Sequence, residues 1–401
     1  MMRYEWKKIF ERRLNVIAML LGYILIGICV FNYVTQERFY DEKTDSYIEG
    51  IEAIRMEQER AKAQTDMITE EYMTELISEI QSHDMDLESD EAYLEVIRPL
   101  GEIFYFAAES YTDMRENIID KNALGELDLT DGARFYEHRM EKITDYLNCD
   151  FSYGNYTESE KAYWVEKARK TNIPFQWGDQ SVMNYIWDLV FVGVYLLFVV
   201  VICTSSVFSA EYESGAAFLL LTTKYGKDRM IWSKIAVSVL FVVGYLMGGA
   251  LLAVGSIALV LGLPGADLPV QLWNSVIPYN LTVGQACLCN LAIVVLIGIA
   301  LALVLLFSSA GVRSSLATLV IGAAIIIAPA FFPMSKESGL WNHINYLFPV
   351  RACNLEEMMG SFVSYTIGNV IFSYVAMVVI VYTVISVGAL LLIRRAFVKA
   401  R

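Results

Sequence analysis

The sequence FSAEYESGAAFLLLTTKYGKDRMIWSK, which runs from Phe208 to Lys234, decides how the chain is arranged. It separates two long apolar runs, carries four Lys or Arg residues, and has a helix-like first half. Short connectors rich in Lys and Arg lie on the cytoplasmic side of a membrane. We therefore expect a chain that crosses a membrane several times and keeps this connector in the cytosol.

The charges of the chain are concentrated in one region. Of 401 residues, 56% are apolar and 19% are charged, and the net charge is -14. Residues 35–185 hold 35 Asp or Glu against 15 Lys or Arg, a balance of -20, so the rest of the chain sums to +6. This distribution is typical of an integral membrane protein with one water-soluble insert. It argues against nucleic-acid binding through a basic surface.

Six apolar runs predict six transmembrane helices, and the fold class is therefore an all-α polytopic membrane protein. The first run, residues 14–34, has 21 residues without a charge, enough at ~1.5 Å per residue to cross a hydrocarbon layer of ~30 Å. The other spans are expected at 186–208, 235–263, 286–310, 316–332 and 367–393, with an extracellular or re-entrant segment at 333–366 and a basic tail at 394–401. The basic segment 1–13 is either an amphipathic interfacial helix or a plain positive flank of the first span.

The acidic insert, residues 35–185, is expected to be a mainly helical domain with its own core. Gln36 to His83 contains no proline and one glycine, which favours one long helix. Thr157 followed by Glu160 is a capping-box pattern. No alternating strand pattern is evident. Further helices are predicted at 89–122, with an interruption at Pro99, at 131–147 and at 158–171.

The placement of Lys and Arg predicts the orientation of the spans. If the amino terminus is cytoplasmic, the segments on the inside are 1–13, 209–234, the loop around Arg313 and the tail 394–401. They hold five, four, one and four Lys or Arg residues, whereas the short outside loops 264–285 and 333–366 hold none and two. The positive-inside rule therefore places both termini in the cytoplasm and the acidic insert outside a cell membrane.

Several chemistries are not supported by the sequence. No cluster of His, Cys and carboxylates has the spacing of a metal site, and no span carries the groups of an enzyme active site. The sequence has no phosphate-binding loop, because Gly226-Lys227 is followed by Asp228. If ATP is used, another polypeptide binds it. Cys149 and Cys353 are the two cysteines expected outside the membrane, and one disulfide between them is an open alternative.

The connector resembles the cytoplasmic segment of ABC-2 type permeases, the membrane subunits of one class of ATP-binding cassette exporter (type V). The count of six spans, the basic start and the INYLFP sequence at Ile344 to Pro349 are similar to that family as well. Lys224 stands where the family pattern has a proline. The resemblance is carried in the connector by Phe208, Glu211, Glu213, Gly215, the Leu219 to Leu221 run, Arg229 and Lys234.

This resemblance implies a coupling helix that docks into a cytosolic ATP-binding cassette ATPase. ATP and Mg²⁺ would be bound by that partner, with no cofactor on this chain. A second permease, identical or related, would complete the transport path between the two copies. The exported substrate would be a peptide, a lipid or an antimicrobial.

The residues of the connector are compatible with docking. The acidic pair Glu211 and Glu213 suits a cationic partner surface or a helix N-terminus. Gly215 allows close backbone approach, and Phe218 and Leu221 are candidate anchors. Lys224 and Arg229 are expected to meet acidic groups or membrane lipid. The competing interpretation is a solvated amphipathic connector.

Two other functions remain open at this point. One is a sensor whose outside domain binds a signal, and the other is an ATP-driven scaffold that acts on partners outside the cell without moving cargo. The acidic domain could close the exit path, recruit a partner or attract a cationic peptide. The plainest alternative is that the domain is acidic because it is soluble.

Overall fold

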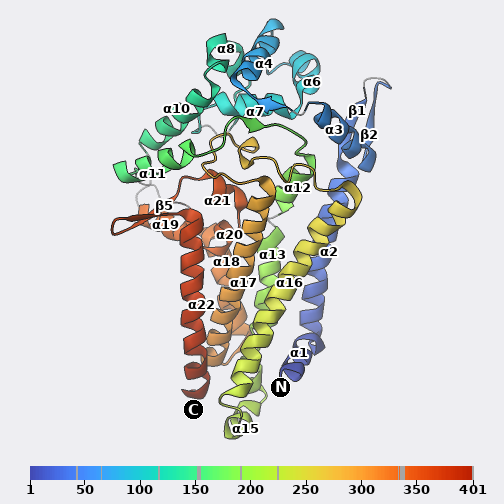
Figure 1. Cartoon of the computed structure of the whole chain (residues 1–401). Helices are drawn as coiled ribbons and strands as arrows, with labels where there is room; N and C mark the ends of the chain where they lie inside the picture. Colours follow the sequence, from blue (N-terminus) through green and yellow to red (C-terminus); the bar gives the residue numbers. More distant parts are fainter. Residues whose placement is uncertain are drawn as a thin grey trace.

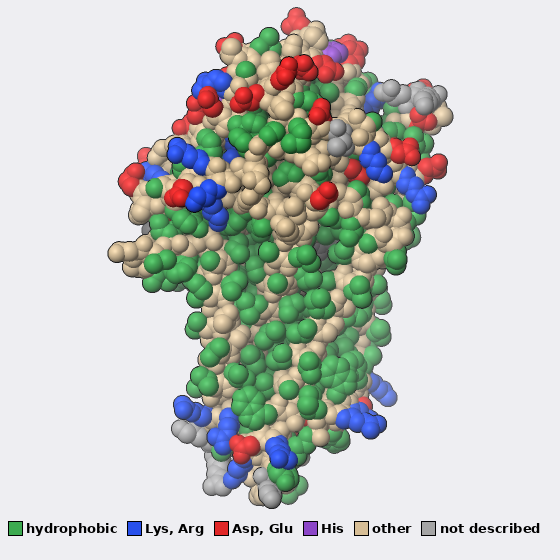
Figure 2. Space-filling model, in the orientation of Figure 1, with side chains coloured by type: hydrophobic (Ala, Val, Ile, Leu, Met, Phe, Trp, Pro, Cys, Tyr) green, Lys and Arg blue, Asp and Glu red, His purple; other side chains and the backbone are tan. Residues whose placement is uncertain are grey.

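The computed structural model of the chain describes residues 1–41, 44–64, 66–115, 118–150, 155–189, 192–223, 225–332, 334 and 339–399. The protein is mostly helical and has two parts: a bundle of long helices and a head of short helices at one end of it (Figure 1). On the face shown in Figure 2, a broad apolar band covers the bundle, with acidic side chains over the head and Lys and Arg gathered at the opposite end. We call this opposite end the basic end.

The prediction of membrane-spanning helices is confirmed for five segments that are long and apolar enough to cross a membrane. Their mean hydropathy is between 2.3 and 3.1. They are α2 (Arg13–Gln36), the segment Val192–Glu213 that contains α13 (Val192–Thr204) and α14 (Ser209–Glu213), α16 (Arg229–Leu261), α17 (Val283–Val312) and α22 (Tyr374–Lys399). The segment expected at 316–332 forms α18 (Ser315–Phe331), an apolar helix of 17 residues.

The boundaries of three expected spans differ from the prediction. The segment expected at 186–208 contains α12 (Ser181–Leu189), which begins five residues earlier, and α13, which ends at Thr204; residues 190 and 191 between them lie outside the described residues. Helix α16 begins at Arg229, so part of the connector belongs to it. The last helix begins at Tyr374 because the preceding residues pair as a hairpin of β5 (Ser364–Ile367) and β6 (Val370–Ser373). These differences arise where the apolar sequence continues past the end of a helix, or where polar residues beside an apolar run still belong to the helix.

The bundle is held together where small residues let helices approach. A side chain at Gly249 would meet Leu196 and Ile26, and one at Gly298 would meet Leu246. Small residues at such contacts permit close helix packing when no hydrophobic driving force acts between helices. The α2–α16 contact is supplemented by stacking of the rings of Tyr23 and Tyr245, whose centroids are 4.8 Å apart.

The head is mainly helical, as predicted, but the expected long helix from Gln36 to His83 is wrong. That stretch contains a hairpin, two helices and a further strand. Gly50 has a φ of 76° immediately before α3, a conformation that favours glycine. The expected absence of strands is also wrong, because three two-stranded antiparallel sheets occur among the described residues. The strands outside the last hairpin are β1 (Arg38–Asp41) paired with β2 (Ser46–Glu49), and β3 (Met67–Ile68) paired with β4 (Phe175–Gln176).

The other predicted helices of the head are present, with shorter bounds. The capping box of Thr157 and Glu160 is confirmed at the start of α11. The head helices are α3 (Ile51–Ala63), α4 (Glu70–Ser82), α5 (Asp90–Ala92), the π-helix η1 (Tyr93–Ile97), α6 (Arg98–Leu100), α7 (Glu102–Tyr111), α8 (Ala123–Glu126), α9 (Leu129–Gly132), α10 (Phe135–Asn148) and α11 (Glu158–Arg169). Short elements between the long helices are α1 (Met2–Glu11), α15 (Ala216–Thr222), the 3₁₀-helix η2 (Val270–Leu272), α19 (Gly339–Tyr346), α20 (Pro349–Ala352) and α21 (Leu355–Gly360).

The head is packed onto the bundle through buried contacts. Trp164 of α11 is fully buried, and its ring lies 5.5 Å from that of Phe362 and 6.4 Å from that of Tyr279. The guanidinium of Arg139, only 4% exposed, donates to the backbone oxygens of Ser275 and Ile277. Burial lowers the pKa of Arg139 to about 10. The head and the head-proximal loops of the bundle therefore share one core.

The open alternative of a disulfide between Cys149 and Cys353 is wrong, since both thiols are free. Cys353 is completely buried in the main core and its backbone oxygen accepts from Asn290 at 3.0 Å. Cys149 is half-buried at the end of α10. The two cysteines belong to different environments, because Cys353 lies inside the fold and is not on an outer surface.

Candidate functional site

The connector forms the tip of the basic end, where both chain termini also lie (Figure 1). It consists of α14, a turn at Gly215, α15 and the turn that leads into α16. Gly215 has a φ of 74°, and a side chain there would meet no atom within 4 Å. Within this chain the glycine therefore serves the left-handed backbone between two helices and not a close approach.

The short helix α15 presents apolar side chains to its surroundings. Phe218 is 63% exposed and Leu219 is 73% exposed. Leu221, by contrast, is half-buried and packs against the core cluster that contains Phe208 and Ala217. An apolar pair on a terminal tip is the kind of feature that marks an interaction surface. Phe218 keeps the position expected of an anchor, and Leu219 is better placed than Leu221 to be the second.

The basic residues predicted for the connector have different settings. The guanidinium of Arg229 lies over the ring of Tyr225, 4.7 Å from its centroid. Lys224 lies outside the described residues. Asp228 forms an exposed ion pair with Arg394 of α22, with Nε and Oδ1 2.8 Å apart. The turn after α15 is thus tied to the last helix.

Glu211 does not face outward as expected, because it belongs to a buried cluster of four charges. Nζ of Lys234 donates to Oε1 of Glu211 and to Oε2 of Glu5, both at 2.8 Å. Nζ of Lys8 donates to the same Oε1 of Glu211 at 2.7 Å and to Glu5 at 3.2 Å. We call Glu5, Lys8, Glu211 and Lys234 the four-charge cluster. It joins α1, α14 and α16.

Burial makes the four-charge cluster energetically important. The Lys234 side chain is 1% exposed, and those of Glu5 and Glu211 are 10% exposed. Two carboxylates balance two ammonium groups, so the cluster is neutral as a whole. For Lys8, burial acts to lower the pKa, but the hydrogen bond that Lys8 donates to Glu211 and the charges of both carboxylates outweigh it and raise the pKa. Removing one member leaves an uncompensated buried charge, which is costly.

Glu213 is held at the start of another helix. Its carboxylate accepts from the backbone nitrogen of Ser315 at 2.7 Å and from the Ser315 hydroxyl at 3.0 Å. A carboxylate at a helix N-terminus satisfies an unpaired amide and interacts favourably with the helix dipole. Of the two settings expected for the acidic pair, Glu213 takes the helix N-terminus, at α18.

Helix α14 has further contacts with the remaining helices of the bundle. The Ser309 hydroxyl of α17 accepts from the backbone nitrogens of Phe208 and Ser209, at 3.1 and 2.7 Å. The rings of Tyr212 and Phe397 of α22 are 5.5 Å apart, and the Tyr212 hydroxyl donates to the Phe397 oxygen. Helix α14 and the residue before it therefore contact α1, α16, α17, α18 and α22.

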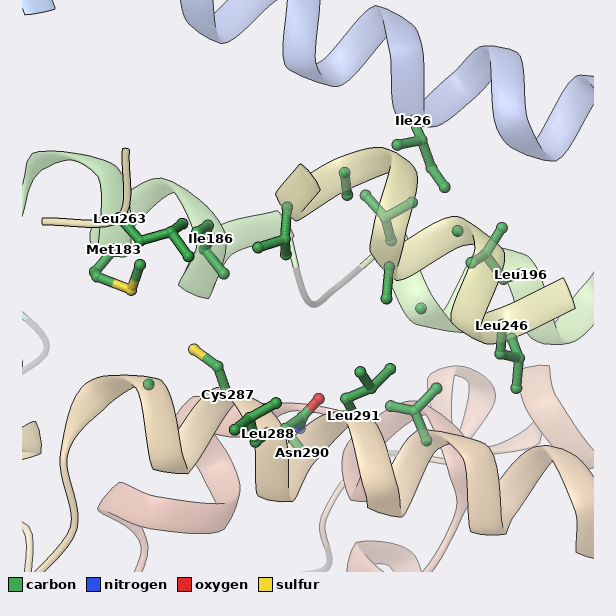
Figure 3. A pocket seen from close by; sticks show the side chains of 18 of the residues that line it. Ile26, Met183, Ile186, Leu196, Leu246, Leu263, Cys287, Leu288, Asn290 and Leu291 are labelled. Atoms are coloured by element: carbon green, nitrogen blue, oxygen red, sulfur yellow. The ribbon is translucent and has the colours of Figure 1, made fainter. Parts of the chain in front are cut away.

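An apolar cavity of about 330 Å³ lies inside the head-proximal half of the bundle (Figure 3). It is bounded by α2, α12, α13, α16 and α17. Its walls are aliphatic, including Ile26, Leu196 and Leu246, and Asn290 directs its amide oxygen toward the space while its nitrogen donates to Cys353. Such a lining does not suit a path for a polar solute.

The described residues contain no group of three His, Cys, Asp or Glu side chains that could hold a metal ion. Comparisons with protein-family models, with curated proteins and with solved structures found no match.

Glu5 and Lys8 are the functional candidates that the sequence prediction did not identify. Both lie in the basic segment that was expected to be an interfacial helix or a positive flank. Glu5, Lys8 and Ile9 lie on one face of a helix because they are spaced by three and four residues. The sequence signal that could have identified Glu5 was an acidic residue on the same helix face as the apolar Ile9, within an otherwise basic segment. Tyr4, Trp6 and Phe10 are exposed, so α1 is amphipathic, with its aromatic rings outward.

Proposed function

We propose that this chain is the membrane subunit of an ATP-binding cassette exporter of the ABC-2 type. In this proposal α18 is the sixth span, the head lies outside the cell, and the basic end and both termini lie in the cytosol. A separate cytosolic ATPase binds ATP and Mg²⁺, and a second permease, identical or related, completes the transport path.

The observation that carries the proposal is the exposed apolar pair Phe218 and Leu219 on α15. Burying a Phe or Leu side chain in a partner contributes about 1.5–3 kcal/mol each. The surrounding cations favour contact with acidic groups on that partner or with lipid headgroups. The positions of Lys and Arg at this end agree with a cytosolic location.

The contacts of α14 supply a mechanism for coupling. Approach of two ATPase subunits would displace α15, and the fixed contacts of α14 would carry that displacement to the long helices. Lys234 is central, because it connects the connector to α1 and lies in the first turns of α16. The chain itself performs no chemistry in this scheme; it converts a movement at the basic end into rearrangement of the spans.

Affinity purification tests the docking surface. The solubilised wild-type protein is isolated from its native host beside the variant Phe218→Asp with Leu219→Asp, and co-purifying ATPases are identified by mass spectrometry. We expect a cytosolic ATPase to co-purify with the wild type and to be lost from the variant, because two apolar side chains that the partner would bury become charged.

The matched control is Ile118→Asp with Leu129→Asp, which changes two exposed apolar side chains of the head. This control should retain the ATPase. If the wild type captures no ATPase, or if both double variants retain it equally, the proposed docking surface is refuted.

The alternative proposal is an ATP-driven or signal-responsive membrane scaffold or sensor that acts through the head without moving cargo. The buried packing of Arg139 and Trp164 between head and bundle favours it, since such contacts would transmit a change in either direction. An ATPase would co-purify with a scaffold as well. Uptake or efflux measured in reconstituted vesicles separates the two, because a scaffold moves no solute.

A further inference from the structure

A second, larger cavity lies where the head meets the bundle. Its volume is about 840 Å³. It is bounded by α7 of the head, by the start of α12, by the loop around η2 and by α21. Four segments that are distant in sequence therefore enclose one space, and none of them takes part in the docking surface.

The cavity has aromatic walls. Tyr105 and Phe106 of α7 line it together with Trp177 and Trp273. The indole nitrogen of Trp273 donates to the Asn184 side chain at 2.5 Å, which holds that ring in place. Aromatic faces attract cations and also bury apolar surface.

Four carboxylates line the same cavity, and two of them have no cationic partner. Glu109 pairs with Lys142 at 3.2 Å, and Glu357 pairs with Arg351 at 2.6 Å. Glu102 accepts a hydrogen bond from Asn184 at 3.2 Å, and neither it nor Glu356 has an ion-pair partner among the described residues. Glu102 and Glu356 are thus the two carboxylates of the cavity wall that form no ion pair with a described residue.

Two polar side chains of the cavity wall have unused hydrogen-bonding capacity. Gln180 lines the cavity and is only 4% exposed as a residue, and its side-chain amide forms no hydrogen bond with another described residue. Oε2 of Glu357, which also lines the cavity, is buried and has no hydrogen-bond partner among the described residues, although Oε1 pairs with Arg351. A buried polar atom without a partner costs free energy, which a hydrogen-bonding ligand in the cavity would recover.

We propose that this cavity binds an organic cation, an ammonium or guanidinium group carried on an apolar, preferably aromatic, body. Glu102 and Glu356 compensate the charge, Gln180 accepts a hydrogen bond, and the aromatic walls cover the apolar part. The volume is in the range of sites for small organic ligands. The binding claim concerns the chain alone and does not depend on an ATPase partner.

The protonation of Glu102 supports this ligand class. Glu102 is an exposed residue of α7, and its carboxylate lies at the wall of the cavity. Desolvation by the neighbouring protein atoms and the negative charges of Glu57 and Asp179 raise the pKa of Glu102 to about 7, and the hydrogen bond from Asn184 and the charge of Arg60 offset only part of this rise. A bound cation favours the ionised form. Affinity should therefore increase as the pH rises from about 6 to about 8.

The test uses the full chain in nanodiscs of zwitterionic phosphatidylcholine, with 9-aminoacridine as a fluorescent aromatic cation and acridine as its neutral counterpart at pH 8. We expect saturable binding of the cation and much weaker binding of acridine. Glu102→Gln with Glu356→Gln should weaken the cation's affinity about tenfold or more, since one lost charge-assisted hydrogen bond is enough for such a change.

The control is Glu79→Gln with Glu95→Gln, which neutralises two exposed carboxylates of the head outside the cavity. It should leave the affinity within about twofold. Thermal unfolding of both double variants identifies a folding defect, and Gln180→Leu tests the site without changing its charge. Equal affinity for acridine, or equal binding by wild type and the Glu102 and Glu356 variant, would overturn the proposal and would leave the docking result unaffected.

Discussion

Replacing Lys234 by methionine tests whether the four-charge cluster holds the connector. The ammonium of Lys234 uses all three of its donors, on Glu5 and Glu211 at 2.8 Å each and on the backbone oxygen of Val207 at 3.0 Å. Methionine keeps an unbranched apolar stem that reaches as far as Cε but removes the ammonium group and its charge. Two carboxylates that are 10% exposed would then share Lys8 alone.

The expected loss is about 3–5 kcal/mol in the free energy of unfolding, the range for breaking a buried ion pair by removing one partner. Because Lys8 still pairs with both carboxylates, we expect a loss near the lower end of this range. Adding Glu211→Gln to Lys234→Met restores charge balance, so the double variant should recover more than about 1 kcal/mol relative to Lys234→Met. The measurement is unfolding by sodium dodecyl sulfate in mixed micelles, analysed by linear extrapolation.

Arg394→Met is the matched control at the same end of the molecule. Its ion pair with Asp228 is more than half exposed on both sides, and such pairs contribute at most about 1 kcal/mol. A loss for Lys234→Met no larger than that for Arg394→Met would refute the reasoning. So would a double variant that is less stable than Lys234→Met.

Two further predictions concern the head. Thr157→Ala should destabilise α11 by about 1 kcal/mol, because the Thr157 hydroxyl accepts from the Glu160 backbone nitrogen at 3.3 Å. Hydrogen exchange should become faster in the first turn of α11, with Ser82→Ala, an exposed hydroxyl at the end of α4, as the control; unchanged exchange would contradict the cap. The pKa of Glu102 is raised from 4.5 to about 7 in the folded protein, so between these pH values the folded protein holds a proton that the unfolded chain releases. The contribution of Glu102 to the stability of the head should therefore be fully present below about pH 4.5 and be lost as the pH rises through 7. Glu102→Gln should remove that decline in thermal unfolding recorded between pH 5 and 8, and an unchanged pH profile would count against the raised pKa.

Much of the helical architecture could be predicted because its signals are local. An uncharged run from Leu14 to Val34 has to avoid water along its whole length, and α2 spans it. Thr157 and Glu160 satisfy each other's backbone within one turn, so their pattern identified the start of α11. The errors occur where short-range preference is overridden. Residues 36–83 are good helix formers, but the pairing of β1 with β2 and the positive φ of Gly50 interrupt them.

The sequence by itself determined the class of the protein, a helical membrane protein with long apolar segments, an acidic insert and a basic connector. Only the tertiary structure decided which charges are available on that connector. Lys234 contacts both Glu211 and Glu5, which lies 229 positions away, and these contacts make Glu211 an internal group. Phe218, in the same connector, remains exposed. The cavity with Glu102 and Glu356 likewise exists because distant segments converge. Apolar length and capping are properties of neighbouring residues, whereas burial, charge pairing and cavities depend on which surfaces meet after folding.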